Sequence, residues 1–167
     1  SSGDVNLMPK ASVPPARPDY VYEADGLATA YYSPFQGDSQ WSAAYEEMAR
    51  DWYPDQPGLD IRWRMWILTS VAKQVRDLPG DIAEFGVYRG GCARMILETV
   101  GLPPGKRYHL FDTFEGMPPP TDKDRRHDGR LASQMMTEQG RDTPLWAVAT
   151  LDDVRAEVLA PDRLNTT

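Results

Sequence analysis

Two stretches of the sequence decide the fold: GDIAEFGVYRGGCA at residues 80–93 and YHLFDTF at residues 108–114. The first reads as a short apolar strand with an acidic residue near its end, followed by a glycine turn and the start of a helix. The second reads as another short strand that ends on an aspartate. This order is typical of one half of a nucleotide-binding βαβ fold. It predicts an α/β enzyme whose ligand contains adenosine.

Length and composition limit the classes of protein to which the chain can belong. Its 167 residues are enough for one domain with a buried core. A formal net charge of −7 argues against the basic surface that nucleic-acid binding needs, and no apolar run approaches the roughly 18 residues of a membrane span. The single cysteine, Cys92, excludes an intrachain disulfide and is typical of a reducing compartment. We therefore expect a cytoplasmic protein with no nucleic-acid and no membrane partner.

The chain is expected to have three parts. Residues 1–19 contain four prolines and no apolar period, which predicts a flexible tail. Residues 20–58 form an N-terminal lid or helical segment. The aromatic side chains of residues 20–35 lie on a stretch that we expect to be irregular, where they either dock it onto the core or cover the ligand as a lid. Residues 59–167 are expected to form the first half of a Rossmann-like domain.

Hydrophobic periodicity predicts the helices around this unit. One helix is expected from Ser39 to Trp52, capped by Ser39 or Ser42. A second is expected from Leu59 to Leu78. Its predicted core stripe recurs at steps of three or four and consists of Trp63, Ile67, Val71, Val75 and Leu78. The later elements are a helix from Gly90 to Val100 that Gly101 ends, a strand from 107 to 111, and weaker helices over 131–139 and 151–159.

The glycine spacing limits the classes of ligand that the turn can bind. Gly86, Gly90 and Gly91 do not match the G-x-G-x-x-G of dinucleotide folds, and no Gly-Lys-Ser/Thr follows as in a P-loop. A wider turn behind an acidic strand suits a ligand that lacks a diphosphate and carries a cationic amino-acid end. S-adenosylmethionine is such a ligand.

Each residue of the turn has a chemical role in this hypothesis. Glu84 would face the ammonium and sulfonium charges, and Gly86 would leave room beside the backbone. Gly90 and Gly91 would offer free N–H groups at a helix N-terminus to the ligand carboxylate. Asp112 would accept hydrogen bonds from the ribose hydroxyls. The alternatives are a surface salt bridge for Glu84 and a helix cap with close packing for the glycines.

The same segments carry a family resemblance. DIAEFGVYRGG at residues 81–91, with HLFDTFEGMP at residues 109–118, resembles the macrocin O-methyltransferase family over about residues 40–165. That family uses S-adenosylmethionine to methylate sugar hydroxyls of macrolides and related antibiotics. The resemblance implies a class I methyltransferase fold, with a doubly wound, mostly parallel sheet and a small glycosylated acceptor as partner. The predicted cofactor-binding residues are Glu84, Gly86, Tyr88, Gly90, Gly91, Asp112, Thr113 and Phe114.

Family members also carry aspartates that bind a divalent metal, usually magnesium, in strand-ending motifs of the second half. Nothing in residues 120–167 matches those motifs, so any Mg²⁺ would be held by residues beyond this chain. Two predicted strands are few for a doubly wound sheet, so we expect the chain to be the N-terminal half of a larger domain. Its open sheet edge leaves room for a homo-oligomer, and we expect no turnover by this chain alone.

Other reactive side chains carry weaker signals. Cys92 sits at a helix N-terminus, a position that lowers a thiol pKa, but no second cysteine or base accompanies it, so we interpret it as a packing residue. His127, in a charged loop, is the candidate catalytic base, although it can equally have no role. The alternative to a methyltransferase is a non-catalytic module that binds an adenosine ligand. A nicotinamide-dependent enzyme is disfavoured by the missing G-x-G-x-x-G.

Overall fold

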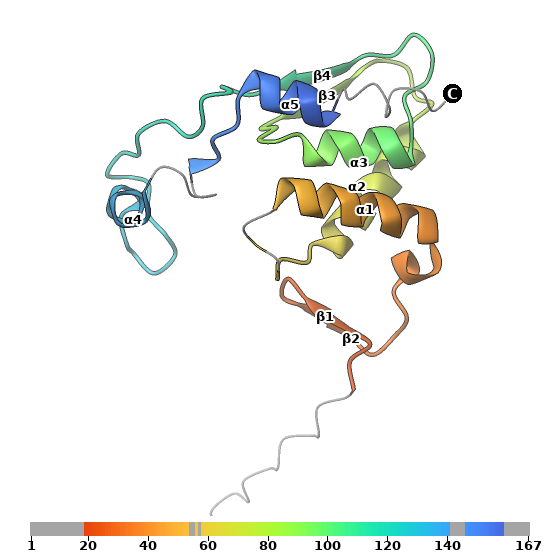
Figure 1. The fold of residues 1–167 in the computed structure, drawn as a ribbon, viewed down its shortest axis with the longest axis horizontal. Coiled ribbons are helices and arrows are strands. Elements are labelled where there is room, and N and C mark those ends of the chain that lie inside the picture. The colour runs from red at the N-terminus through yellow and green to blue at the C-terminus, as the bar shows by residue number, and fades with distance from the viewer. Residues whose placement is uncertain (1–18, 54–55, 57, 141–145, 159–167) are drawn as a thin grey trace, which may run out of the picture.

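The computed structural model describes residues 19–53, 56, 58–140 and 146–158 as a mixed α/β arrangement (Figure 1). Within these residues two sheets of two strands each are present, one antiparallel and one parallel. The predicted tail therefore lies almost wholly outside the described residues. The elements are β1 (Tyr22–Ala24), β2 (Leu27–Thr29), the 3₁₀ helix η1 (Pro34–Gly37), α1 (Ser39–Trp52), α2 (Arg62–Val75), β3 (Ile82–Phe85), α3 (Gly91–Thr99), β4 (Tyr108–Phe111), α4 (Ala132–Gln139) and α5 (Leu151–Val158).

The central unit is β3–α3–β4, and it confirms the predicted βαβ order. The two strands are parallel, in a register that places Ile82 opposite Tyr108 and Phe85 opposite Phe111. Helix α3 connects them and covers one face of the sheet. It ends where Gly101, at φ +75°, donates its N–H to the carbonyl of Ile96, as predicted for a C-terminal glycine. The carboxyl ends of β3 and β4 consequently meet at one edge of the sheet.

The segment before α1 is more regular than its sequence suggested. Strands β1 and β2 form a hairpin whose turn residues, Asp25 and Gly26, both have positive φ, at 53° and 75°. An Asp-Gly pair in this conformation makes the tight turn that a two-residue hairpin needs. The expectation of an irregular stretch is therefore wrong here. Phe35 is buried in the core while Tyr31 and Tyr32 stay exposed, so only part of the aromatic set docks the segment.

Helices α1, α2 and α3 enclose the main hydrophobic cluster. Its buried members are Phe35, Trp41, Tyr45, Met48, Ile61, Met65 and Met95. Helix α1 has the predicted bounds, but its cap is Asp38, whose Oδ1 accepts from the backbone N–H of Trp41 at 2.9 Å. The prediction of Ser39 or Ser42 as the cap is wrong.

The predicted core stripe of α2 is exposed for most of its length. Ile67, Val71, Val75 and Leu78 are 43–58% exposed, whereas Met65 and Thr69 are buried against α1 and α3. The helix is apolar on more than one side, and the side that packs is set by its neighbours rather than by its own period.

Near the sheet, Phe85 is 78% and Phe111 50% exposed. Both lie on the sheet face that α3 does not cover.

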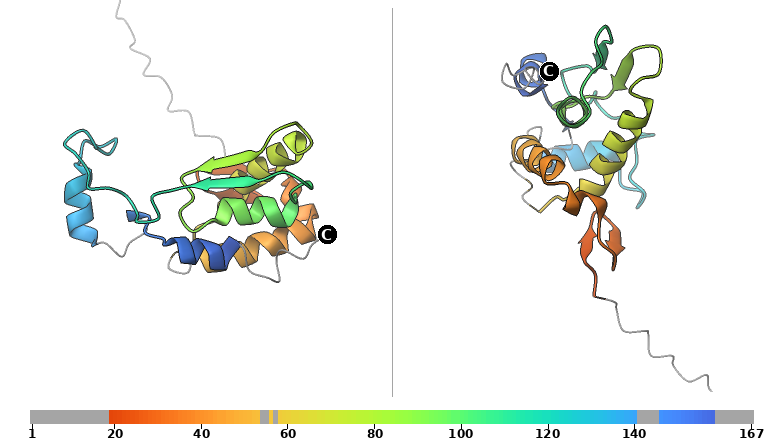
Figure 2. Two further views of the ribbon diagram at one scale, coloured as in Figure 1. Left: turned by 90° about the horizontal axis from the view of Figure 1, so that it is seen from above. Right: turned by 90° about the vertical axis from the view of Figure 1, so that its right-hand side faces the viewer.

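The last two helices differ in how they join this body. Helix α5 packs beside α3, whereas α4 stands apart from the sheet and from the helices around it (Figures 1 and 2). Both helices were expected from the sequence. No helix in the described ranges is long and apolar enough to cross a membrane.

Candidate active site at the glycine turn

Asp112 joins the two turns that follow β3 and β4. Its Oδ2 accepts the backbone N–H groups of Val87 at 2.7 Å and Tyr88 at 2.9 Å, and its Oδ1 accepts that of Phe114 at 3.1 Å. The hydroxyl of Thr113 donates to Oδ1 at 3.3 Å. Burial alone would raise the pKa of Asp112, but the bonds from the Tyr88, Phe114 and Val87 N–H groups outweigh it and hold the pKa below its usual range. The carboxylate is therefore ionised at neutral pH.

Glu84 lies on the side of β3 that faces α3. The hydroxyl of Tyr108, on the neighbouring strand, donates to its Oε2 at 2.7 Å. Burial raises the pKa of Glu84, and the nearby charge of Asp112 adds to the rise, while the bond from Tyr108 partly offsets it. Glu84 is therefore half-buried and hydrogen-bonded rather than part of a surface salt bridge.

The three glycines of the turn have different surroundings. At Gly86, with φ +87°, an added Cβ would meet no atom within 4 Å, so the backbone there has open space beside it. At Gly90 a Cβ would lie 2.4 Å from Val158 Cγ2, and at Gly91 it would lie 2.5 Å from the ring of Trp52. Close packing with α5 and α1 thus requires glycine at 90 and 91. The open position is Gly86, where the sequence predicted room for a ligand.

The other predicted cofactor residues support the turn. Tyr88 has φ 52°, and the guanidinium of Arg89 lies 5.6 Å from its ring centroid. Thr113 is exposed, and its hydroxyl shares its one proton between Asp112 Oδ1 at 3.3 Å and the carbonyl of Gly116 at 3.0 Å. Phe114 is half-buried against the cluster of Val87, Ala93, Val154 and Val158. The structure therefore brings all eight predicted residues together at the ends of β3 and β4 and at the start of α3.

Sequence reasoning missed two residues of this region. Trp52, the last residue of α1, packs on Gly91 and has its ring centroid 6.1 Å from that of Tyr88. Tyr108 holds Glu84, as described above. The spacing of these residues within their own segments gave no sign of either contact. In the strand register Glu84 pairs with Leu110, and Tyr108 lies two residues before Leu110 on the same face of the sheet. Knowledge of this register would have indicated the contact between Tyr108 and Glu84.

Cys92 and His127 were the other candidate reactive side chains. Burial raises the pKa of the Cys92 thiol to about 11, which is consistent with a packing role and not with a reactive thiolate. His127 is exposed in the loop between β4 and α4. Among the described residues, no group of three or more His, Cys, Asp or Glu side chains could hold a metal ion.

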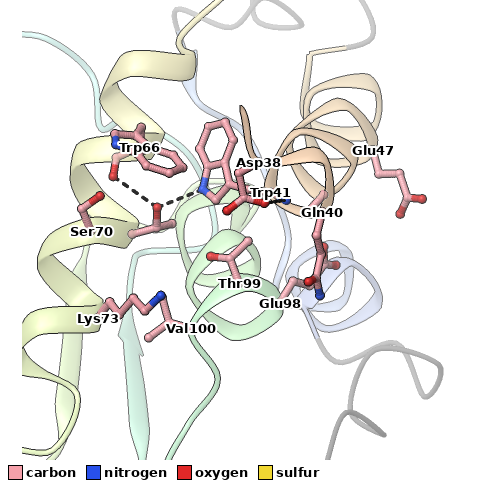
Figure 3. A pocket seen from close by; sticks show the side chains of 12 residues that line it. Asp38, Gln40, Trp41, Glu47, Trp66, Ser70, Lys73, Glu98, Thr99 and Val100 are labelled. Atoms are coloured by element: carbon pink, nitrogen blue, oxygen red, sulfur yellow. Dashed lines mark hydrogen bonds between the residues drawn. The ribbon is translucent and has the colours of Figure 1, made fainter. Parts of the chain in front are cut away.

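A cavity of about 390 Å³ adjoins the turn. Arg89 contributes to its lining, together with Asp51, Asp153 and Glu157. Val148 and Ala156 complete the lining, so charged and apolar groups share it. A second cavity lies elsewhere, between α1, α2 and α3 (Figure 3).

Two acid-bearing parallel strands, a glycine turn and a helix N-terminus define the class: an α/β protein built around a parallel β3–α3–β4 unit. Residues 25–154 match the model of the macrocin-O-methyltransferase (TylF) family. The chain belongs to this family, which implies a methyltransferase and is consistent with a class I fold. No curated protein and no solved structure matches the chain.

Proposed function

We propose that this protein is an S-adenosylmethionine-dependent O-methyltransferase that acts on a sugar hydroxyl of a macrolide-like natural product, in the cytoplasm. The observation that carries the proposal is the arrangement of Glu84, Gly86 and Asp112 around the carboxyl ends of β3 and β4. Membership of the macrocin-O-methyltransferase family supports the reaction class and suggests the kind of acceptor.

The described residues fit the cofactor. The open backbone at Gly86 leaves space for it. The Gly86 N–H donates to the carbonyl of Phe111 at 2.9 Å, which brings this space close to Asp112, the residue after Phe111. Glu84 would face the cationic amino-acid end. Asp112 would accept a ribose hydroxyl at Oδ1, where the 3.3 Å bond from Thr113 is the longest of its four. Bound S-adenosylmethionine supplies an electrophilic methyl group to the acceptor oxygen.

The chain's own contribution is to hold and orient the cofactor and the acceptor. Three backbone N–H groups bound by Asp112 fix the turn before any ligand arrives, so little ordering remains to be done on binding. Holding donor and acceptor in line is itself a large part of catalysis in a bimolecular transfer. His127 remains the candidate base for the acceptor hydroxyl.

The first test is calorimetric titration with S-adenosylhomocysteine. The Glu84→Gln variant keeps an oxygen for Tyr108 and loses the charge, so we expect it to fold and to bind more weakly by about 1.5–3 kcal/mol, which is roughly ten- to a hundredfold. Glu115→Gln, an exposed acid in the turn after β4, is the matched control and should stay within about twofold. Equal affinities for the three proteins would contradict the proposed role of Glu84.

The second test is transfer of a labelled methyl group to a glycosylated macrolide. Labelled product shows a methyltransferase. Binding of S-adenosylhomocysteine without transfer fits both the alternative, a module that binds the adenosine ligand without catalysis, and the expectation that this chain alone does not turn over, so labelled product is the outcome that separates the two.

A further inference from the structure

The carboxylate of Glu84 is held by one of its two oxygens. Tyr108, on the neighbouring strand, donates its hydroxyl to Oε2 at 2.7 Å. In the described part of the chain Oε1 accepts no hydrogen bond, and protein atoms do not enclose it. Two residues further along, the backbone of Gly86 has open space beside it. One oxygen of Glu84 is therefore fixed by the protein, and the other is available to a ligand.

The strand register explains why Tyr108 makes this contact. Ile82 pairs with Tyr108 and Glu84 pairs with Leu110, so Glu84 and Tyr108 are diagonal neighbours on the sheet face that α3 covers. A long side chain can span this diagonal, and the phenol of Tyr108 does so. Because the two strands are hydrogen-bonded to each other, the contact is set by the sheet and not by a loop.

The titratable groups that face Glu84 among the described residues come from different elements. They are Tyr108 from β4, Asp112 from the turn after β4, and Cys92 from α3. Burial and the charge of Asp112 raise the pKa of Glu84, and the hydrogen bond from Tyr108 opposes both effects. Burial and the bond with Glu84 raise the pKa of Tyr108 in turn, so the phenol stays neutral and acts as a donor. Cys92 also keeps its proton, since burial raises the pKa of its thiol to about 11.

We propose that Tyr108 is a positioning residue of the cofactor site: by holding Oε2 it keeps Glu84 ionised and leaves Oε1 for the ammonium group of S-adenosylmethionine. This inference rests on the proposed function and adds to it a residue that acts through Glu84. It also implies a pH dependence. Glu84 attracts the ammonium group only when it is ionised, and the hydroxyl of Tyr108 favours the ionised form. Loss of that hydroxyl therefore moves the acid limit of binding to higher pH.

Calorimetric titration of S-adenosylhomocysteine into the full chain, from pH 5 to pH 8, tests the proposal. Tyr108→Phe removes the hydroxyl and keeps the ring, so the packing of the strand is retained. We expect it to weaken binding about threefold or more at pH 7, and by a larger factor toward pH 5. In a Glu84→Ala background the same change should alter the affinity less than twofold, because the carboxylate through which Tyr108 acts is gone.

Tyr45→Phe is the matched control. It removes another buried phenol hydroxyl, which accepts the backbone N–H of Ile61 at 2.8 Å in the core between α1 and α2. Its loss should lower stability without affecting the strand ends. We expect an affinity within about twofold of the wild type and the same pH profile.

Carbon-13 NMR of the Glu84 carboxyl in the ligand-free protein gives a readout that does not depend on binding. The pKa of Glu84 should be higher in Tyr108→Phe than in the wild type and unchanged in Tyr45→Phe. Absence of binding by the wild type would overturn the proposed function and this role with it. If the wild type binds, a loss of the same size at every pH, the same loss with and without Glu84, or an unchanged pKa of Glu84 in Tyr108→Phe would overturn the role of Tyr108 alone.

Discussion

At the scale of single residues, Asp112 accepts three backbone N–H groups that come from both sides of the candidate site. Replacing it by alanine leaves the N–H groups of Val87, Tyr88 and Phe114 without their acceptor. We expect Asp112→Ala to lower the free energy of unfolding by about 1–3 kcal/mol, as measured by urea denaturation at pH 7. Asp122→Ala removes the same charge from an exposed loop and should change it by no more than about 0.5 kcal/mol.

The contribution of Asp112 should also depend on pH. Its pKa is lowered in the folded protein, so the folded state binds its proton less tightly than the unfolded state. The stabilisation is complete above the unfolded pKa of about 3.9 and is lost as the pH falls through the lower folded value. The difference between wild type and Asp112→Ala should therefore shrink below about pH 4. A constant difference from pH 7 to pH 2 would show that the charge is not responsible.

The sequence predicted those candidate site residues that a single segment marks by its own pattern. Glu84, Gly86 and Asp112 stand at strand ends, where an acid or a glycine is itself the signal. The contacts of Trp52 with Gly91 and of Tyr108 with Glu84 join segments far apart in the chain, and no spacing within either segment encodes them. The same limit applies to Gly90 and Gly91. Their sequence is compatible both with ligand binding and with close packing, and only the neighbouring helices reveal the packing.

At the scale of elements, the amino end of α3 is held close to α5 by Gly90. Alanine at Gly90 or at Gly86 would have to adopt a positive φ, which costs about 1–2 kcal/mol in either place. At Gly90 the new methyl group also meets Val158 at 2.4 Å, and overpacking of this kind costs a further 1–3 kcal/mol or so. Thermal and urea unfolding should therefore show a larger loss for Gly90→Ala than for Gly86→Ala.

A double variant separates the two causes. Val158→Ala removes the methyl groups that Gly90→Ala would strike, so it should recover part of the stability lost by Gly90→Ala and none of that lost by Gly86→Ala. Losses of the same size at both glycines, or the absence of recovery, would mean that α5 does not pack on the turn in solution.

Helix α2 shows why an element can be predicted while its orientation is not. Its apolar period correctly indicated a helix, but Trp63, Met65, Trp66 and Leu68 make it apolar around most of its circumference. Which side becomes buried depends on how α1 and α3 meet it, and that information is not in the α2 sequence.

The hairpin of β1 and β2 was missed for a different reason. Its strands have three residues each, too few to show an alternating pattern, and only the Asp-Gly turn signals them.

At the scale of the whole molecule, one buried arginine joins three helices. The side chain of Arg94, on α3, is 1% exposed and binds Asp51 of α1 at 2.8 Å, Glu98 of its own helix at 2.8 Å and Glu157 of α5. Burial alone would lower the pKa of Arg94, but its hydrogen bonds to these carboxylates outweigh that effect and raise it. With Glu47 also nearby, four carboxylates surround one guanidinium. One positive charge therefore links carboxylates of three helices.

Arg94→Met should therefore destabilise the protein far more than the loss of a surface ion pair. Four carboxylates from three helices would lose the guanidinium that they share, and removal of one partner of a buried pair costs about 3–5 kcal/mol. Arg155→Met breaks an exposed pair with Asp152 on α5 and should cost no more than about 1 kcal/mol. Urea denaturation at pH 7 measures both.

Because repulsion among the carboxylates is the cause, acidification toward pH 4 or added salt should recover part of the loss in Arg94→Met and little in Arg155→Met. A loss that is the same at every pH and salt concentration would instead assign the effect of Arg94 to packing of its aliphatic stem.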